Sequence, residues 1–210
     1  MNLNSAGENL AHDIEREMMI CLASASPQRS QILRELGLPF TARPVDVEEV
    51  VLATPRETVR ENARRKAETA FPQCPDGTLA LGADTVVEID GRTLGKPHSK
   101  EEAKRYLSLL SGRVVNAWSG IALFGIRDGR TVSETAAECA SAKIKRLTDA
   151  EIEWYVSTGE PMTRAGAFGI SRIGEIFVER IEGAYSCFAG LPKRLLLSML
   201  HGFQNAARPG

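Results

Sequence analysis

Asp84 is the residue whose placement most strongly indicates chemistry, because it lies inside the apolar stretch LALGADTVV of residues 79–87. This pattern predicts a buried strand. An unpaired buried carboxylate costs so much free energy that it must be paired with a cation, protonated or bound to a metal ion. We therefore interpret Asp84 as a candidate functional carboxylate, with a structural salt bridge as the alternative.

Arg29 is the second unusual residue, because it places a cation in the first turn of a predicted helix. In the stretch LASASPQRSQILRELG, residues 22–37, Ser26 is a good N-cap and Pro27 suits the first helical position. At the third helical position the helix dipole disfavours a positive charge by ~0.3–1 kcal/mol, and a bound anion would reverse that sign. The apolar residues 18–23 predict a strand before this turn, an arrangement typical of phosphate sites. A surface arginine that tolerates the penalty is the alternative.

Lys66 lies on the apolar face of a helix predicted to run from a capping box at Thr54 to about Phe71. Its direction on the helical wheel is about 20° from that of Val59, so the side chain is expected to point inward. A phosphate ligand and a lysine that buries its stem while its ammonium reaches solvent are both compatible with this position.

Further charged residues extend this pattern of cations and carboxylates, namely Glu48, Glu49, Lys96 and Arg164. Cations hold phosphate oxygens, and carboxylates hold a divalent ion and orient water, so the set predicts a polyphosphate site with metal ligands. The sequence lacks a GxxxxGK[ST] loop, which excludes a P-loop nucleotide hydrolase. The three histidines show no spacing for zinc or for a nucleophilic triad.

The remaining pattern predicts a mixture of helices and strands. Capping boxes begin helices at Ser99 and Thr148, and Pro192 begins the last helix. An Asp90-Gly91 pair predicts a hairpin turn. Strands are predicted over residues 114–126, 131–145 and 175–181, while the glycine-rich residues 159–169 predict no regular element. The order of elements indicates an α/β or α+β fold.

Size and composition are those of a cytoplasmic globular protein. With 210 residues, 43% hydrophobic and 25% charged, the chain can form one domain around a good core. We expect a loose extension over residues 1–17, a single bilobed domain over 18–203 and a tail over 204–210. The net charge of −1 gives no basic field for nucleic acid, and no signal peptide or membrane span is predicted. The cysteine spacings fit no metal site and favour reduced core cysteines.

Seven motifs occur in an order that resembles the Maf family of nucleoside triphosphate pyrophosphatases. They are Ser24-Ala-Ser26-Pro27-Gln28-Arg29, Val45-Asp-Val-Glu48-Glu49, Ala63-Arg-Arg-Lys66-Ala67, Gly82-Ala-Asp84-Thr-Val-Val, Gly95-Lys96-Pro97, Ala165-Gly-Ala-Phe-Gly-Ile170 and Gly190-Leu-Pro192. The resemblance implies a bilobed, mixed-sheet α/β fold related to inosine triphosphatases, with a cleft between the lobes. It also implies a divalent cation, Mg²⁺ or Mn²⁺, cleavage of a nucleoside triphosphate to its monophosphate and pyrophosphate, and compatibility with a homodimer.

The same resemblance implies roles for individual residues. Asp84 would be the proton acceptor or would position a metal-bound water, and it would share the metal with Glu48 and Glu49. The residues expected to bind phosphate are Ser24, Ser26, Arg29, Lys66, Lys96 and Arg164. Gln28 and Ser171 depart from the family pattern of arginine and glutamine, so we expect them to set specificity, with a modified or pyrimidine nucleotide preferred to ATP or GTP.

Two other functions are compatible with the same residues. A nucleotide-binding regulator of septum formation could keep every phosphate ligand, but it would not need a buried carboxylate directed at water. A phosphatase that releases single phosphates would also keep the cations. Only a pyrophosphatase produces intact pyrophosphate, so product analysis separates these functions.

Overall fold

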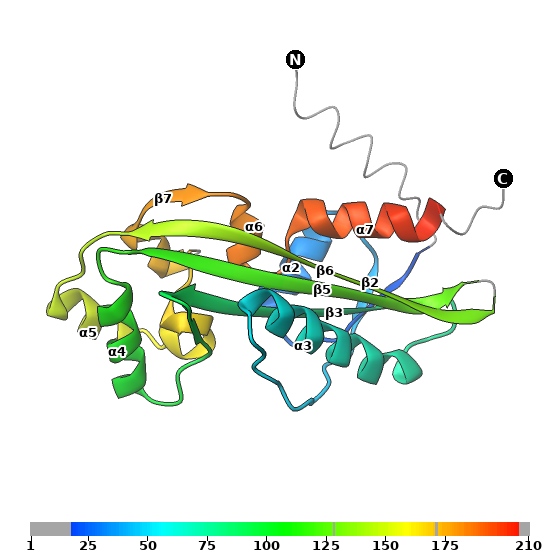
Figure 1. Cartoon of the computed structure of the whole chain (residues 1–210), viewed down its shortest axis with the longest axis horizontal. Helices are drawn as coiled ribbons and strands as arrows, with labels where there is room; N and C mark the ends of the chain where they lie inside the picture. The colour runs from blue at the N-terminus through cyan, green and yellow to red at the C-terminus, as the bar shows by residue number, and fades with distance from the viewer. Residues whose placement is uncertain (1–17, 128, 171, 206–210) are drawn as a thin grey trace, which may run out of the picture.

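A computed structural model describes residues 18–127, 129–170 and 172–205 (Figure 1). The predicted N-terminal extension, Ser171 and the last five residues of the predicted tail lie outside these ranges. No helix in the described ranges is both long enough and apolar enough to cross a membrane.

A mixed sheet of seven strands forms the framework of the molecule. The strands are β1 (Ile20–Leu22), β2 (Phe40–Ala42), β3 (Leu79–Ile89), β4 (Arg92–Leu94), β5 (Val114–Arg127), β6 (Arg130–Ile144) and β7 (Val178–Glu182). They are ordered β2-β1-β3-β5-β6-β7, with β4 also paired to β3. β1 is parallel to both its neighbours, whereas the other pairs are antiparallel. The predicted mixed α/β class is therefore confirmed.

Helices cover both faces of this sheet. They are α2 (Pro27–Glu35), α3 (Pro55–Ala70), α4 (Lys100–Leu110), α5 (Asp149–Ser157), α6 (Tyr185–Phe188) and α7 (Lys193–Asn205). Short 3₁₀ turns are η1 (Phe71–Gln73), η2 (Glu160–Thr163), η3 (Ala165–Ala167) and η4 (Arg172–Phe177). Figure 1 shows α3 and α7 on opposite sides of the long strands β3, β5 and β6. α7 begins directly after Pro192, as predicted, and the helix continues two residues beyond the predicted domain end at 203.

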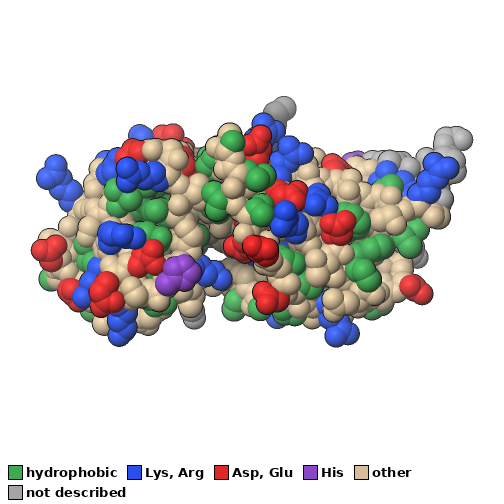
Figure 2. All heavy atoms as spheres, turned by 60° about the horizontal axis from the view of Figure 1, so that its bottom comes forward, with side chains coloured by type: hydrophobic (Ala, Val, Ile, Leu, Met, Phe, Trp, Pro, Cys, Tyr) green, Lys and Arg blue, Asp and Glu red, His purple; other side chains and the backbone are tan. Residues whose placement is uncertain are grey.

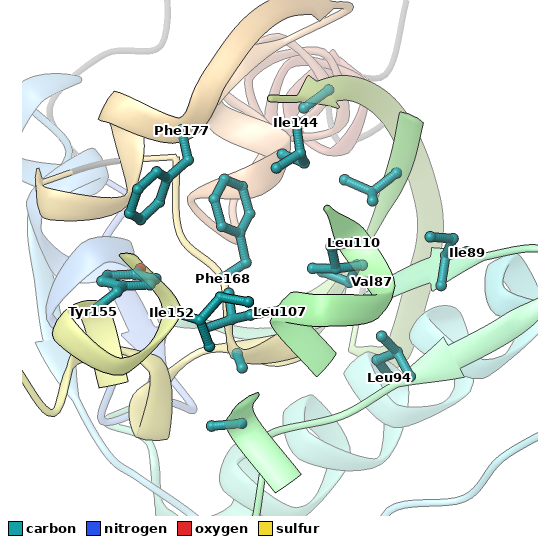
Figure 3. Close-up of a cluster of buried hydrophobic side chains, with 14 of the residues drawn as sticks. Val87, Ile89, Leu94, Leu107, Leu110, Ile144, Ile152, Tyr155, Phe168 and Phe177 are labelled. Atoms are coloured by element: carbon teal, nitrogen blue, oxygen red, sulfur yellow. The ribbon is translucent and has the colours of Figure 1, made fainter. Parts of the chain in front are cut away.

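Two hydrophobic cores lie along the same long strands, which gives the molecule two lobes. The first core contains side chains from β1, α2 and α7 together with Leu79, Leu81 and Ala83 of β3. The second contains α4, α5 and η3 together with Val87 and Ile89 of the same strand. Figure 3 shows Tyr155, Phe168 and Phe177 gathered in the second core. β3 thus passes from one core to the other between residues 83 and 87.

α3 lies unusually close to the sheet because two glycines face it. A Cβ atom at Gly82 would overlap the backbone carbonyl of Ala63, and one at Gly120 would overlap that of Val59. The alanines of α3 then pack directly on Ala80 and Ala122. This close approach fixes the depth at which the side chains of α3 reach the sheet.

The strand predicted over residues 175–181 is partly wrong. Residues 172–177 form the 3₁₀ turn η4, and β7 begins only at Val178. Val178 pairs with Ile144, the last residue of β6, so residues 175–177 lie beyond the end of that strand. Phe177 is instead buried in the second core. Ile176 and Phe177 are hydrophobic, as strand residues often are, but they belong to the turn η4 and not to the sheet. The sequence pattern therefore suggested a strand that begins too early.

The prediction of four reduced cysteines is also wrong. Cys21 on β1 forms a disulfide with Cys74, which follows η1 at the end of α3, and their Cα atoms are 5.9 Å apart. Cys139 and Cys187 are free, and burial raises the pKa of the Cys187 thiol to about 12. The bonded pair is separated by 53 residues and is brought together only by the packing of α3 on the sheet. Cysteine usage therefore gives no argument for a reducing compartment.

Candidate active site

The centre of β3 has one open edge, and Asp84 lies at its middle. β5 pairs with the opposite edge throughout residues 80–88. On this edge β1 pairs with residues 79–81 and β4 with residues 87–89. Within the described chain, no strand pairs with this edge over residues 82–86. Successive side chains point to opposite faces of a strand, so Asp84 and Thr85 flank this gap from the two sides of the sheet.

The Asp84 carboxylate is paired on the α3 face of the sheet. Its Oδ1 atom lies 2.7 Å from the Lys66 ammonium, and its Oδ2 atom accepts a hydrogen bond of 3.2 Å from the Asn62 amide. The Asp84 side chain is 7% exposed and that of Lys66 is 13% exposed. Lys66 points inward, as predicted, but it does not direct its ammonium to solvent. The structure thus supplies the partner that the buried carboxylate requires.

The same ammonium holds a second carboxylate, that of Glu49, at 2.6 Å. Glu49 lies in the segment between β2 and α3, which Asn62 fixes through hydrogen bonds of 2.9 and 3.1 Å to the backbone of Val50. Thr58 of α3 fixes the same segment by accepting a hydrogen bond from the Leu52 amide. α3 therefore places both Lys66 and the loop that carries its partner.

Arg29 lies on the opposite face of the sheet and is held by three contacts. Its Nε donates to the carbonyl of Gly190 at 3.0 Å, Nη1 to Ser24 Oγ at 3.0 Å and Nη2 to Thr85 Oγ1 at 3.4 Å. Burial lowers the pKa of this guanidinium, and the charges of Asp84 and Glu49 raise it. Arg29 therefore interacts electrostatically with the carboxylates of Asp84 and Glu49, which lie across the open edge of β3.

The N-terminus of α2, which carries Arg29, also contacts Arg164, the residue that precedes η3. Ser26 is the N-cap residue, although its side chain makes no capping hydrogen bond. The hydrogen-bonding neighbours assign the orientation of the Gln28 amide: its nitrogen donates to Ser26 Oγ, and its oxygen accepts from both terminal nitrogens of Arg164 at 2.9 and 3.0 Å. α2 belongs to the first core, whereas η3, which follows Arg164, belongs to the second. Gln28 and Arg164 thus connect the two lobes.

Arg164 is held from its other side by an acid. Glu160 lies 3.8 Å from Arg164 Nη2, and both side chains are about nine-tenths buried, with 8% and 11% exposed. Glu160 also accepts a hydrogen bond from the backbone of Ile173. Arg164 therefore forms part of a buried polar group that extends to the surface of α2.

Two predicted residues are less closely connected to this group. Lys96 is exposed, and the hydrogen bond from the Gly166 amide to the Gly95 carbonyl places its segment beside η3. Glu48 is exposed, and its backbone carbonyl accepts a hydrogen bond from Arg65. Ser171 lies outside the described residues. The roles predicted for Lys96, Glu48 and Ser171 stay predictions.

The residues present can be tested against the predicted divalent ion. The described ranges contain no group of three or more His, Cys, Asp or Glu that could hold a metal. Glu49 and Asp84 nevertheless converge on one ammonium. Mg²⁺ is commonly bound by one or two carboxylates together with substrate phosphates, so this pair fits an ion that arrives with a nucleotide.

Sequence reasoning missed several residues of this site. Asn62 carries a recognisable signal, because it lies one helical turn before Lys66 and interrupts the apolar stripe between Val59 and Ala63. Thr85 and Ser119 carry none, because hydroxyls are common in strands.

The molecular surface is hollowed between the two halves of the molecule, with acidic and basic side chains along the margin (Figure 2). This agrees with the predicted cleft between lobes. A separate surface pocket of about 210 Å³ is lined by Leu52, Glu57, Arg60, Glu61, Arg64 and Thr135. None of the predicted site residues lines that pocket.

Comparison with known proteins gives matches over most of the chain. The family model described as "Maf-like protein" matches residues 19–203. The dTTP/UTP pyrophosphatase of Thermotoga maritima is 38% identical over 185 residues, covering 88% of this chain and 89% of that protein. The dTTP/UTP pyrophosphatase of Thermococcus onnurineus is 44% identical over 179 residues, covering 85% and 94%.

Comparison with solved structures also gives matches, among them two at low sequence identity. The Staphylococcus aureus Ham1 protein has a TM-score of 0.48 and 16% identity, with 88% of this chain and 99% of that chain covered. A nucleoside-triphosphatase / dITP/XTP pyrophosphatase from Mycobacterium abscessus has a TM-score of 0.40 and 18% identity, with 92% and 100% covered.

Proposed function

Because the chain belongs to the Maf-like protein family, we propose that it hydrolyses dTTP and UTP to the corresponding monophosphate and pyrophosphate. Relatives with that activity in their names are 38–44% identical and are matched over nearly their full length. The motifs in the sequence agree with this class, since Gln28 and Ser171 predict a modified or pyrimidine nucleotide as the substrate.

The observation that carries this proposal is the open edge of β3, with a carboxylate on one side and a guanidinium on the other. Arg29 and Lys66 supply positive charge for the phosphate chain. Asp84 supplies a base at the same edge. Stability alone does not require Asp84, Arg29 and Lys66 to meet at the open edge of β3, so their arrangement favours a catalytic role.

In the reaction we propose, water attacks the α-phosphorus atom while the bond between that atom and the bridging oxygen breaks. Pyrophosphate leaves with the electron pair of that bond. Asp84 accepts the proton of the attacking water, and Lys66, 2.7 Å from this carboxylate, holds it in place. Arg29 binds oxygens of the phosphate chain, where negative charge redistributes as the bond breaks.

We also propose that the reaction requires Mg²⁺ or Mn²⁺, held by Glu49 and Asp84, with Glu48 as the neighbouring acid. Such an ion, when bound, would neutralise phosphate oxygens and lower the pKa of a coordinated water. Lys66 contacts both carboxylates, so it would shift when the ion binds. Full activity after exhaustive chelation would contradict this requirement, and the ion's binding to the Glu49→Gln variant can be measured separately by calorimetry.

The decisive experiment incubates the pure protein with dTTP, UTP, dCTP, ATP and GTP and separates the products. We expect dTTP and UTP to give monophosphate and intact pyrophosphate at the highest kcat/KM. Release of orthophosphate alone would identify a phosphatase, and nucleotide binding without turnover would favour a regulator. Gln28→Arg should redistribute kcat/KM among the nucleotides, whereas an equal change for all of them would remove Gln28 from base selection.

A further inference from the structure

The contacts of Arg29 extend through the hydroxyl groups of Thr85 and Ser119 to the Cys187 carbonyl of α6. We propose that Thr85, Ser119 and Gly190 are positioning residues that fix the Arg29 guanidinium for the phosphate chain. This inference rests on the proposed function, in which Arg29 binds the triphosphate. It adds residues that contact the arginine or one another.

The direction of each hydrogen bond in this chain follows from the number of available protons. Ser119 Oγ donates its single proton to the Cys187 carbonyl at 2.7 Å. The 2.8 Å contact between Thr85 and Ser119 must then use the proton of Thr85. Thr85 Oγ1 keeps its lone pairs for Arg29 Nη2. Ser119 therefore makes Thr85 an acceptor that faces the arginine.

Gly190 provides the third contact that holds the Arg29 guanidinium. Its carbonyl accepts the Nε proton, and its φ of +89° is one that residues with a side chain rarely adopt. A Cβ atom there would lie 3.2 Å from Thr85 Oγ1 and 3.4 Å from Arg29 Nε. A larger residue would be strained and would crowd both groups.

This arrangement leaves a defined set of donors for a ligand. A guanidinium has one N–H on Nε and a pair on each terminal nitrogen, and the three contacts use one from each position. One N–H remains on each terminal nitrogen, which is the set that can bind two oxygens of a phosphate. Ser24 acts as acceptor for both Arg29 and the Ser26 amide, so its own proton can also reach a phosphate oxygen.

The first test compares threonine variants in steady-state hydrolysis of dTTP. Thr85→Val keeps the shape but removes the acceptor, and we expect kcat/KM to fall by ~10-fold or more, since small displacements of binding groups have effects of this order. Thr85→Ser keeps a hydroxyl and should retain most of the activity. Thr135→Val is the matched control, because Thr135 accepts a 3.0 Å hydrogen bond from Arg60, away from the site.

Two kinetic results would overturn the proposal. One is a Thr85→Val enzyme as active as Thr135→Val, and the other is a Thr85→Ser enzyme that loses as much activity as Thr85→Val. Thermal unfolding of each variant separates these results from loss of the fold. If Thr85→Val does not fold, Ser119→Ala takes its place, with the same expected loss of kcat/KM and the same contrary result.

The second test needs no substrate and so distinguishes this proposal from the proposed function. The Arg29 Nε–H signal, assigned by its loss in Arg29→Lys, is followed by NMR hydrogen exchange. We expect exchange to be at least ~10-fold faster in Thr85→Val and unchanged in Thr135→Val, because exchange reports local opening. Equal exchange in Thr85→Val and the wild type would overturn the proposal. A wild type that hydrolyses neither dTTP nor UTP would instead contradict only the proposed function.

Discussion

At the residue scale, the two charges at the centre of the candidate site depend on each other. Asp84 is almost fully buried and has Lys66 and Asn62 as its polar partners. Lys66 is nearly as buried, with Glu49 as its second partner. A buried ion pair adds little net stability, but removing one partner leaves the other charge uncompensated. Substitutions on the two sides of this pair should therefore have different consequences.

Lys66→Met tests the pair through stability. We expect it to destabilise the protein by about 3–5 kcal/mol, because the Asp84 carboxylate would keep only its hydrogen bond from Asn62. The double variant Lys66→Met/Asp84→Asn should recover much of that loss. Urea unfolding of both variants checks this. A single variant as stable as the wild type would mean that Lys66 contributes nothing to holding Asp84.

Asp84→Asn tests the same residue through catalysis. Asparagine has nearly the same shape but cannot accept the proton of water, so turnover of dTTP should fall by at least ~10²-fold while the nucleotide still binds. Single-turnover kinetics and equilibrium binding measure the two quantities separately. If the Asp84→Asn variant has unchanged turnover, another group is the base, and Glu49 is the first candidate.

At the scale of elements, local capping explains where helices begin and how one of them responds to acid. Thr148 accepts from the Glu151 amide, and the Glu151 carboxylate accepts from the Thr148 amide, which completes the predicted capping box of α5. The carboxylate also accepts from Lys145 at 2.6 Å. The start of α5 thus combines a cap with an ion pair to the segment after β6.

Glu151→Gln should remove a stability contribution that depends on pH. The Lys145 hydrogen bond, followed by those from Thr148, lowers the pKa of Glu151 to about 2 from 4.5. A carboxyl whose native pKa is depressed stabilises the fold above its unfolded pKa and loses this contribution as the pH falls towards its native pKa. The wild type should therefore exceed the variant in stability at pH 7, and the difference should shrink between pH 4.5 and pH 2. Urea unfolding at several pH values would show this, whereas a constant difference would contradict it.

At the scale of the whole molecule, two links join segments that are far apart in sequence. The Cys21–Cys74 disulfide joins β1 to the end of α3, and these two elements lead into opposite sides of the candidate site. The Gln28–Arg164 hydrogen bonds join the first core to the second. Both links restrict how the parts of the site move relative to each other.

Cys74→Ser should lower the free energy of unfolding by about 2–5 kcal/mol, because the disulfide closes a long loop in the unfolded chain. Unfolding of the oxidised wild type and of the variant, each with and without a reductant, measures the effect. The reductant should destabilise only the wild type. A wild type insensitive to full reduction would show that the bond contributes nothing to stability.

Gln28→Ala and Arg164→Ala should show an energetic coupling of about 0.5–3 kcal/mol in a double-mutant cycle, because the two residues share a charge-assisted hydrogen bond and the Arg164 side chain is only 11% exposed. Lys104 and Glu153 provide the control cycle, since they form an exposed ion pair between α4 and α5. A coupling no larger than in the control would mean that this contact does not connect the lobes energetically.

The sequence by itself determined the local structure and the chemical class of the site. The helix starts at Thr54, Ser99 and Thr148 follow from side chains that reach only three residues along the chain. The Asp90-Gly91 turn, where both residues have positive φ, depends on neighbouring residues alone. A buried aspartate required a partner wherever it was placed. Local interactions and the cost of burying charge are properties of the residues, so the chain order was enough to predict them.

Only the tertiary structure decided which residues meet. Lys66 was expected to point inward, but its partner became known from the packing of α3 against Gly82 and Gly120. Thr85 and Ser119 face each other because β3 and β5 pair in one register. A shift of that register by one residue would turn every side chain to the other face. The Cys21–Cys74 and Gln28–Arg164 contacts depend on the same long-range packing, which no local pattern encodes.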